Sequence, residues 1–127
     1  MEQNIITLVA EEGTSLSSGS LRLYALPYGC VDLYAYDPVN RRAAVGIVVS
    51  VRHRRKGHAL AMLACLADMY RGQLHSLYAD IAATNTASLA LFSKAGYVEC
   101  GHFSEWLFDG DNYTDTIRMQ LVLDKRF

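Results

Sequence analysis

The chain has 127 residues, of which 51% are hydrophobic and 20% charged, and its formal net charge is −1. This length suits one domain with a core of its own, so residues 1–127 are predicted to form a single domain. The near-zero net charge gives no overall attraction to nucleic acid or to an anionic membrane, and no apolar run approaches the roughly 18 residues of a membrane span, so neither partner is predicted.

The first half of the sequence predicts an antiparallel meander. Residues rich in β-branched and aromatic side chains favour strands over 4–10, 21–26, 30–36 and 43–51. Pro27-Tyr28-Gly29 and the segment 37–42 have the residues of turns between these strands. The segment 11–20 is polar and rich in Gly and Ser, and we expect a loop there.

The pattern of the second half begins with a helix. The apolar run 59–70 repeats at helical spacing and ends before Gly72, and a strand is predicted over 76–82. Because the strand 43–51 precedes this helix, the order strand, helix, strand implies a parallel crossover.

A second, shorter helix is predicted over 86–95. Thr84 or Asn85 supplies its N-terminal cap, and Gly96 occupies the position of a C-terminal cap glycine. The last two strands are expected over 97–108 and 113–123, joined by a turn at 109–112. The predicted fold class is therefore α/β (α+β), a mixed and mostly antiparallel sheet of about six or seven strands with two main helices.

Metal binding and secretion are not predicted. Cys30, Cys65 and Cys100 are widely spaced, and the four histidines show no ligand spacing. Unpaired cysteines and the lack of a recognisable signal peptide fit a reducing compartment, and a cytoplasmic location is predicted.

The segment Arg54-Arg55-Lys56-Gly57-His58-Ala59 joins the fourth strand to the first helix. A helix N-terminus leaves about four backbone N–H groups without partners, and its dipole favours an anion. Gly57 lets the backbone approach a ligand closely, and three successive cations add charge of the right sign. The pattern indicates either a phosphate-binding turn or a solvated basic turn. It matches neither the P-loop nor the Rossmann glycine motif.

Two motifs resemble those of the GNAT family of N-acetyltransferases. Arg54-x-x-Gly57-x-Ala59 matches the acetyl-CoA signature [QR]-x-x-G-x-[GA], and NTASLALFSKAGY (85–97) matches N-x-x-[SA]-x-x-[LFY]-[YF]-x-x-x-G-[FY]. Stretches within 32–46 and 110–115 resemble the branch of spermidine and ribosomal-protein N-acetyltransferases. The resemblance implies the GNAT fold, acetyl-CoA as cofactor, and a polyamine, a small amine or a protein N-terminus as acceptor.

The resemblance also implies which residues hold acetyl-CoA. In this fold the fourth and fifth strands splay apart, and the pantetheine arm pairs with the freed backbone. The pyrophosphate lies on the N–H groups that open the following helix. The implied cofactor-binding residues are Ile47, Val48, Val49, Arg54, Arg55, Lys56, Gly57, His58, Ala59, Asn85, Ser88 and Phe92.

The implied chemistry is direct attack of the amine on the acetyl carbonyl, which needs a base and a stabilised oxyanion. The backbone N–H of Val49 is the candidate for the oxyanion. Asp80 stands where related ribosomal-protein acetyltransferases carry a carboxylate base, and an outward-facing strand residue is the alternative. Phe92 replaces the tyrosine that protonates the thiolate. Either Tyr97 or water then gives the proton, or the thiolate leaves unassisted, or catalysis is weak or lost.

Five further residues have two open interpretations each. His75 could relay protons or pack at a strand start, and His102 and Glu105 could border an amine pocket or lie on the surface. Trp106 could stack on a substrate or belong to the core. Asp32 could bind a cationic substrate or pair with an arginine at position 41 or 42.

The N-terminal part departs from the family pattern. Family members carry two helices between the first two strands, and these form much of the acceptor wall. The segment 11–20 is too short for two helices. The site is then open, completed by a partner subunit, or part of a longer protein, and the uncovered sheet edge favours a homodimer. Two function classes stay open: an N-acetyltransferase, and an acetyl-CoA-binding module with weak or no catalysis.

Overall fold

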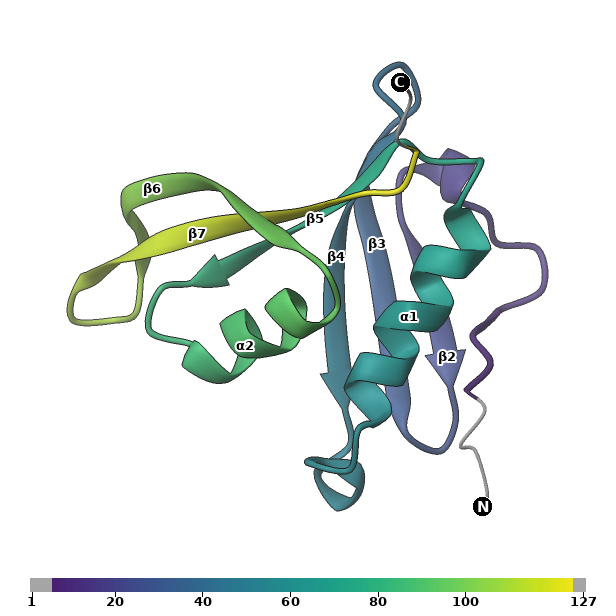
Figure 1. Cartoon of the computed structure of the whole chain (residues 1–127), viewed down its shortest axis with the longest axis horizontal. Coiled ribbons are helices and arrows are strands. Elements are labelled where there is room, and N and C mark those ends of the chain that lie inside the picture. Colours follow the sequence, from purple (N-terminus) through teal and green to yellow (C-terminus); the bar gives the residue numbers. More distant parts are fainter. Residues whose placement is uncertain (1–5, 125–127) are drawn as a thin grey trace.

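The computed structural model describes residues 6–124, which form one seven-stranded sheet in the order β1-β2-β3-β4-β5-β7-β6 (Figure 1). The elements are β1 (Val9–Ala10), η1 (Leu16–Ser18), β2 (Leu21–Ala25), β3 (Gly29–Asp37), β4 (Arg42–Val49), η2 (Val51–His53), α1 (His58–Tyr70), β5 (Ser76–Ala82), α2 (Thr86–Lys94), β6 (Val98–Phe108) and β7 (Tyr113–Val122). The sheet is mixed, because β4 and β5 run parallel while the other neighbours are antiparallel. The predicted fold class is confirmed.

Strands β2, β3 and β4 form the predicted antiparallel meander. Gly29 lets β3 and β4 come close, since a Cβ atom there would lie 1.9 Å from the carbonyl oxygen of Val48. Of the strand predicted over 4–10, only Val9–Ala10 is part of the sheet. The part of that prediction at residues 4 and 5 lies outside the described residues.

Helix α1 connects the parallel strands β4 and β5, as the order of the elements predicts. It begins after Gly57, whose φ of 85° is a left-handed conformation that glycine adopts at little cost. Its buried residues recur at helical spacing; they are His58, Met62, Leu63, Leu66, Ala67 and Tyr70. One side of the helix is therefore apolar and packs on the sheet.

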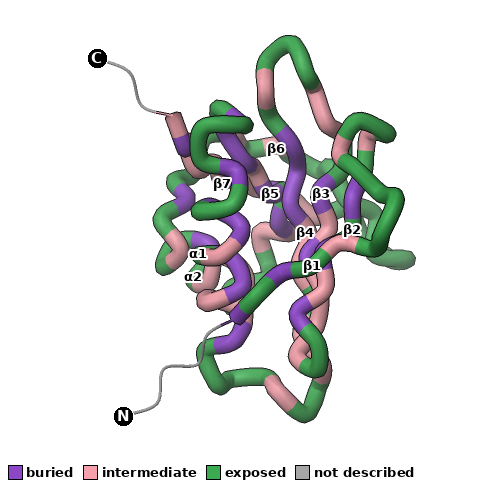
Figure 2. Tube along the Cα trace, turned by 90° about the vertical axis from the view of Figure 1, so that its right-hand side faces the viewer, coloured by how far each residue is buried: buried purple, intermediate pink, exposed green. Residues whose placement is uncertain are grey.

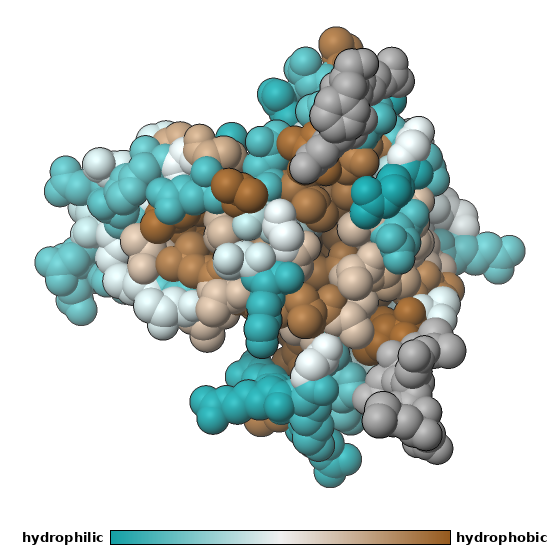
Figure 3. Space-filling view, in the orientation of Figure 1, coloured by the Kyte–Doolittle hydropathy of each residue, from teal (hydrophilic) through white to brown (hydrophobic). Residues whose placement is uncertain are grey.

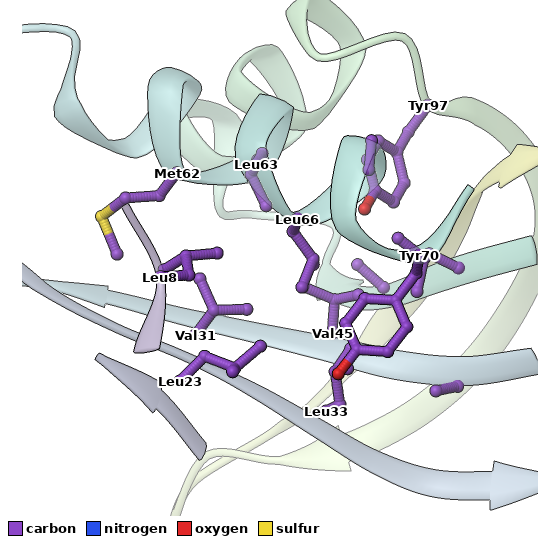
Figure 4. Close-up of a cluster of buried hydrophobic side chains, with 14 of the residues drawn as sticks. Leu8, Leu23, Val31, Leu33, Val45, Met62, Leu63, Leu66, Tyr70 and Tyr97 are labelled. Atoms are coloured by element: carbon purple, nitrogen blue, oxygen red, sulfur yellow. The ribbon is translucent and has the colours of Figure 1, made fainter. Parts of the chain in front are cut away.

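The core lies between the sheet and the two α-helices, which both cover the same face (Figures 1 and 2). Figure 4 shows Leu23, Val31 and Leu33 of the strands beneath Leu63 and Leu66 of α1. All five are at most 2% exposed. Burying a side chain of this size contributes roughly 1.5–3 kcal/mol to the stability of the fold, so these contacts hold α1 on the sheet.

The opposite face of the sheet is covered by neither α-helix. Between β1 and β2 the chain forms a loop with one three-residue 3₁₀ helix, η1, in place of two α-helices. Side chains on this face alternate with core residues along each strand, and many are exposed (Figure 2). The short N-terminal region that the sequence predicts is confirmed.

Candidate functional site

A cavity of about 1020 Å³ lies between the end of β4, the start of α1 and helix α2. The structure brings most of the predicted cofactor residues to its lining: Ile47, Val48, Val49, Arg54, Arg55, Gly57, His58, Ala59, Asn85 and Ser88. Two motifs that are far apart in the sequence thus meet at one cavity. Their part in binding stays a prediction.

The floor of this cavity is an opening in the sheet. β4 pairs with β5 only from Arg42 to Ala44, and beyond this point β4 pairs with β3 alone. In Figure 1 the half of the sheet with β5, β7 and β6 runs away from β2, β3 and β4. The edge of β4 that would face β5 is therefore available to another extended chain. The side-chain Nε of Arg54 donates to the carbonyl oxygen of Val49 at this edge, at 3.1 Å.

The basic turn has the backbone shape of an anion site. Arg55 has a φ of 62° and Gly57 a φ of 85°, and left-handed residues in such a turn direct neighbouring N–H groups to one side. Among the described residues, no N–H group from Arg55 to Leu60 has a partner, and the first that does is Ala61, which donates to the carbonyl oxygen of Gly57 at 3.1 Å. Figure 3 shows hydrophilic side chains at this end of the molecule.

An aromatic cluster that was not predicted from the sequence lies beside the turn. The rings of Tyr28 and His58 stack with centroids 4.0 Å apart, and His53 meets Tyr28 edge-on at 5.1 Å. His53 Nδ1 and the Ser50 hydroxyl lie 2.6 Å apart and share a hydrogen bond. Both histidines line the cavity. The Gly29 turn brings Tyr28 here, and only the fold reveals the contact.

Helix α2 forms the second wall. Asn85 caps it, and its side-chain oxygen accepts the N–H of Ser88 at 3.2 Å. Asn85 also lines the cavity, and its amide NH₂ is a further hydrogen-bond donor. The remaining lining residues of α2, which the sequence analysis did not name, are Ala87, Ala90, Leu91, Ser93 and Lys94. Of these, Leu91 lies three positions after Ser88, on the same helix face, and this spacing is a signal that could have found it.

The structure does not bring Lys56, Phe92 or Tyr97 to the cavity lining. Lys56 is exposed on the turn. Phe92 is 3% exposed and packs edge-to-face on Tyr97, with ring centroids 4.9 Å apart. Burial raises the pKa of Tyr97, and its hydroxyl is buried without a hydrogen-bond partner in the described residues. Both aromatic residues of the second motif are core residues, and the role of Tyr97 as an acid stays a prediction.

Asp80 points away from the helices, because its neighbours Ala79 and Ile81 belong to the core. Both of its oxygens accept hydrogen bonds from Arg118 of β7, at 2.7 and 2.9 Å. This pairing raises the pKa of Arg118, whose guanidinium also lies over the Tyr78 ring at 4.4 Å. Asp80 is thus the outward-facing strand residue of the alternative interpretation, and its role as a base stays a prediction.

Asp32 also pairs across the sheet. It accepts two hydrogen bonds from Arg22, at 2.7 and 2.9 Å, because the register places Arg22 directly opposite on β2. The alternative that Asp32 holds Arg41 or Arg42 is wrong, since those arginines pair with other carboxylates.

The residues singled out on β6 form a separate surface group. His102 Nε2 lies 2.7 Å from Asp115 of β7, and Asp115 also accepts the N–H of Glu105 at 2.9 Å. These contacts lower the pKa of Asp115, the Glu105 N–H more than His102. Trp106 is 63% exposed, which corrects the interpretation as a core residue. His75, at the start of β5, is exposed.

No three His, Cys, Asp or Glu side chains converge as a metal-binding group in residues 6–124. No helix of that range has the length and apolar character needed to cross a membrane.

Comparison with known proteins gives the family. The acetyltransferase (GNAT) domain model matches residues 9–98. The chain therefore belongs to the GNAT acetyltransferase family.

Several of the similar proteins are spermidine N-acetyltransferases of Vibrio cholerae. Spermidine N(1)-acetyltransferase of Vibrio cholerae is 29% identical over 99 residues, which are 76% of this chain and 57% of that protein. The crystal structure of the Vibrio cholerae spermidine N-acetyltransferase with CoA and spermine is 25% identical with a TM-score of 0.78, and the match covers 84% of this chain and 68% of that one. A dodecameric structure of that enzyme, 21% identical, has a TM-score of 0.81 and 95% coverage of both chains, and supports the fold alone. The chain spans little more than half the length of the curated relative.

Proposed function

We propose that this chain binds acetyl-CoA between α1 and α2 and transfers the acetyl group to a primary amine. The observation that carries the proposal is that an unpaired strand edge and an unpaired helix N-terminus border the same cavity. An extended arm with amide groups pairs with a strand edge, and a pyrophosphate is held by backbone N–H groups at a helix start. Membership of the GNAT family supports the same ligand.

The residues of the cavity fit the parts of this ligand. The backbone of Ile47 and Val49 at the open edge of β4 would hold the pantetheine arm, and the N–H groups from Arg55 to Ala59 would hold the pyrophosphate. When bound, acetyl-CoA supplies a thioester that is activated for attack by a nucleophile. Arg54 and Arg55 add positive charge, and charge-assisted hydrogen bonds to phosphate are stronger than neutral ones.

The reaction joins a neutral amine to the acetyl carbon. The amine nitrogen forms a bond to that carbon as the carbon–sulfur bond breaks, the nitrogen loses one proton, and the sulfur gains one, which gives an amide and a thiol. The N–H of Val49 is our candidate for stabilising the carbonyl oxygen. Asp80 is the candidate to receive the amine proton, because a carboxylate has about four lone-pair sites and Arg118 uses two.

A polyamine is the acceptor class that we favour. The similar proteins named above are spermidine N-acetyltransferases, and one was crystallised with spermine. A protein N-terminus lacks such support. Self-association is a further proposal, because β6 is an edge strand with exposed Trp106 and Phe108.

One observation favours a second candidate, an acetyl-CoA-binding module without catalysis. Neither Phe92 nor Tyr97 presents a hydroxyl to the cavity, so α2 supplies no tyrosine proton to the leaving thiolate. Water can protonate the thiolate instead, so we favour the acetyltransferase over the binding module.

Release of CoA from acetyl-CoA separates the two candidates. The assay uses spermidine, spermine, a small monoamine and a peptide with a free N-terminus, alongside calorimetric titration with acetyl-CoA. We expect turnover with the polyamines. Clear binding of acetyl-CoA without turnover of any amine would contradict the enzyme and leave the binding module.

A further inference from the structure

Two imidazole rings lie at the end of the cavity where the basic turn leaves its N–H groups unpaired. His53 belongs to η2 and His58 is the first residue of α1, and both line the cavity. Their ring centroids are 5.9 Å apart, so one ligand can contact both rings. These two residues are the imidazole pair.

The ring of His58 is buried and lacks a hydrogen-bond partner. His58 is 7% exposed, and neither of its ring nitrogens has a partner in residues 6–124. Neither nitrogen is among the fully buried polar atoms without a partner, so a ligand in the cavity can reach the ring. Tyr28 stacks on this ring at 4.0 Å and fixes its plane. Because buried polar groups are almost always hydrogen-bonded, this imidazole is suited to a hydrogen bond with a ligand.

Ser50 sets the orientation of His53. The Ser50 hydroxyl and His53 Nδ1 share a hydrogen bond at 2.6 Å, and Ser50 is itself fixed, because its N–H donates to the carbonyl oxygen of Tyr28 at 2.7 Å. Nε2 of His53 has no partner in residues 6–124 and is not fully buried. When the hydroxyl donates to Nδ1, Nε2 carries the proton, and in the imidazolium both nitrogens are donors. Nε2 can therefore donate to an anion in the cavity.

The charges around the imidazole pair favour an anion. Arg54, Arg55 and Lys94 line the same cavity, and no Asp or Glu of residues 6–124 does. Tyr28 is the other titratable group packed on the two rings. The cations oppose a positive charge on either imidazole, whereas a pyrophosphate would favour it, because an opposite charge within about 4–6 Å stabilises the charged form. Binding of an anion should therefore draw a proton onto the pair.

We propose that His53 and His58 donate hydrogen bonds to the pyrophosphate of acetyl-CoA, and that the pair takes up a proton from solvent when the cofactor binds. This proposal rests on the acetyl-CoA site proposed above. It adds two side chains to the contacts of the basic turn and makes the affinity for the cofactor depend on pH. Because the complex holds more protons than its separate parts, the cofactor binds more tightly as the pH falls from about 8 toward 5, where imidazoles gain charge.

The experiment measures the Kd for 3′-dephospho-CoA at about pH 8 and about pH 6 by calorimetric titration. This ligand keeps the pyrophosphate but lacks the 3′-phosphate, a group that itself titrates near about pH 6. The wild type should bind about three- to tenfold more tightly at the lower pH, since a hydrogen bond from a charged donor is stronger than one from a neutral donor. Titrations in two buffers with different ionisation enthalpies should also show net proton uptake on binding.

Two variants separate the imidazoles from the rest of the site. His53→Gln keeps a neutral N–H donor in place of Nε2 but cannot gain a proton, and His58→Phe keeps a ring to stack on Tyr28 but has no ring nitrogen. Each should reduce the ratio of the two Kd values, and the double variant should bring this ratio to about one. His75→Gln is the matched control, because His75 is exposed and lies outside the cavity lining, and it should keep the wild-type ratio.

The outcomes distinguish this proposal from the function itself. A wild-type ratio of about one, an unchanged ratio in His53→Gln, or an equal reduction in His75→Gln overturns the role of the imidazole pair and leaves the acetyl-CoA site in place. Absence of binding of both acetyl-CoA and 3′-dephospho-CoA to the wild type overturns that site as well. If His58→Phe does not fold, as judged by circular dichroism, His53→Gln alone decides.

Discussion

The buried hydroxyl of Tyr97 predicts that removing it makes the protein more stable. Tyr97 is 2% exposed, and its hydroxyl has no partner among the described residues. A hydroxyl buried without a hydrogen bond costs about 1–3 kcal/mol. Tyr97→Phe removes that cost and keeps the ring that packs on Phe92. We therefore expect the free energy of unfolding to rise by about 1 kcal/mol or more.

The assay is urea unfolding followed by circular dichroism, with thermal unfolding as a second measure. A gain of about 1 kcal/mol raises the Tm by roughly 3–5 °C for a domain of this size. Tyr70→Phe is the matched control: Tyr70 is also buried, but its hydroxyl is not among the fully buried, unpartnered atoms, and its removal should be near neutral. Acetyl transfer by Tyr97→Phe should equal that of the wild type. A lower stability of Tyr97→Phe would contradict the claim that the Tyr97 hydroxyl has no hydrogen-bond partner. A lower kcat would contradict the claim that this hydroxyl takes no part in acetyl transfer.

Three further predictions follow from single residues. Gly29→Ala places a methyl group 1.9 Å from the Val48 carbonyl oxygen and should lower the free energy of unfolding in urea by about 2–3 kcal/mol. Gly46→Ala is the control, because a methyl group there meets only ordinary contacts and should leave the stability nearly unchanged. Equal effects of the two substitutions would contradict the close approach of β3 and β4 at Gly29. The fold lowers the pKa of Asp115, so this carboxylate stabilises the protein fully above pH 3.8, its ordinary pKa, and the stabilisation is lost as the pH falls through the lowered pKa. The difference in unfolding free energy between the wild type and Asp115→Asn should therefore shrink as the pH falls over that range. A difference that does not change with pH would contradict this prediction. Lys94, at the end of α2, lines the cavity together with the basic turn. Lys94→Ala should weaken the binding of CoA about threefold in calorimetry and leave the binding of 3′-dephospho-CoA almost unchanged. Equal losses of affinity for the two ligands would show that Lys94 does not contact the 3′-phosphate.

Local sequence signals predicted most of the elements. The β-branched runs, the Asn85 cap and the helical spacing of 59–70 gave boundaries that agree with the structure within a few residues. The structure brings the basic turn and Asn85 to one cavity, because the parallel crossover that the sequence predicts returns β5 beside β4.

Contacts between distant segments could not be predicted in this way. Phe92 belongs to the second motif, but whether it faces the cavity or the core depends on how α2 packs on the rest of the fold. The pairing of Asp80 with Arg118 depends on the β5–β7 register, which no local pattern specifies. The stacking of Tyr28 on His58 likewise depends on how β3 enters the sheet.

Binding of acetyl-CoA at the basic turn is the central claim, and calorimetric titration of the wild type against Gly57→Glu and Gly57→Gln tests it most directly. Both variants place a side chain of the same shape at a φ of 85°, where a Cβ meets no atom within 4 Å, so they share the same backbone strain and differ in charge. We predict that Gly57→Glu binds acetyl-CoA at least about tenfold more weakly than Gly57→Gln, a difference of ~1.4 kcal/mol, because the carboxylate repels the pyrophosphate. Equal affinities of the two variants would contradict the claim.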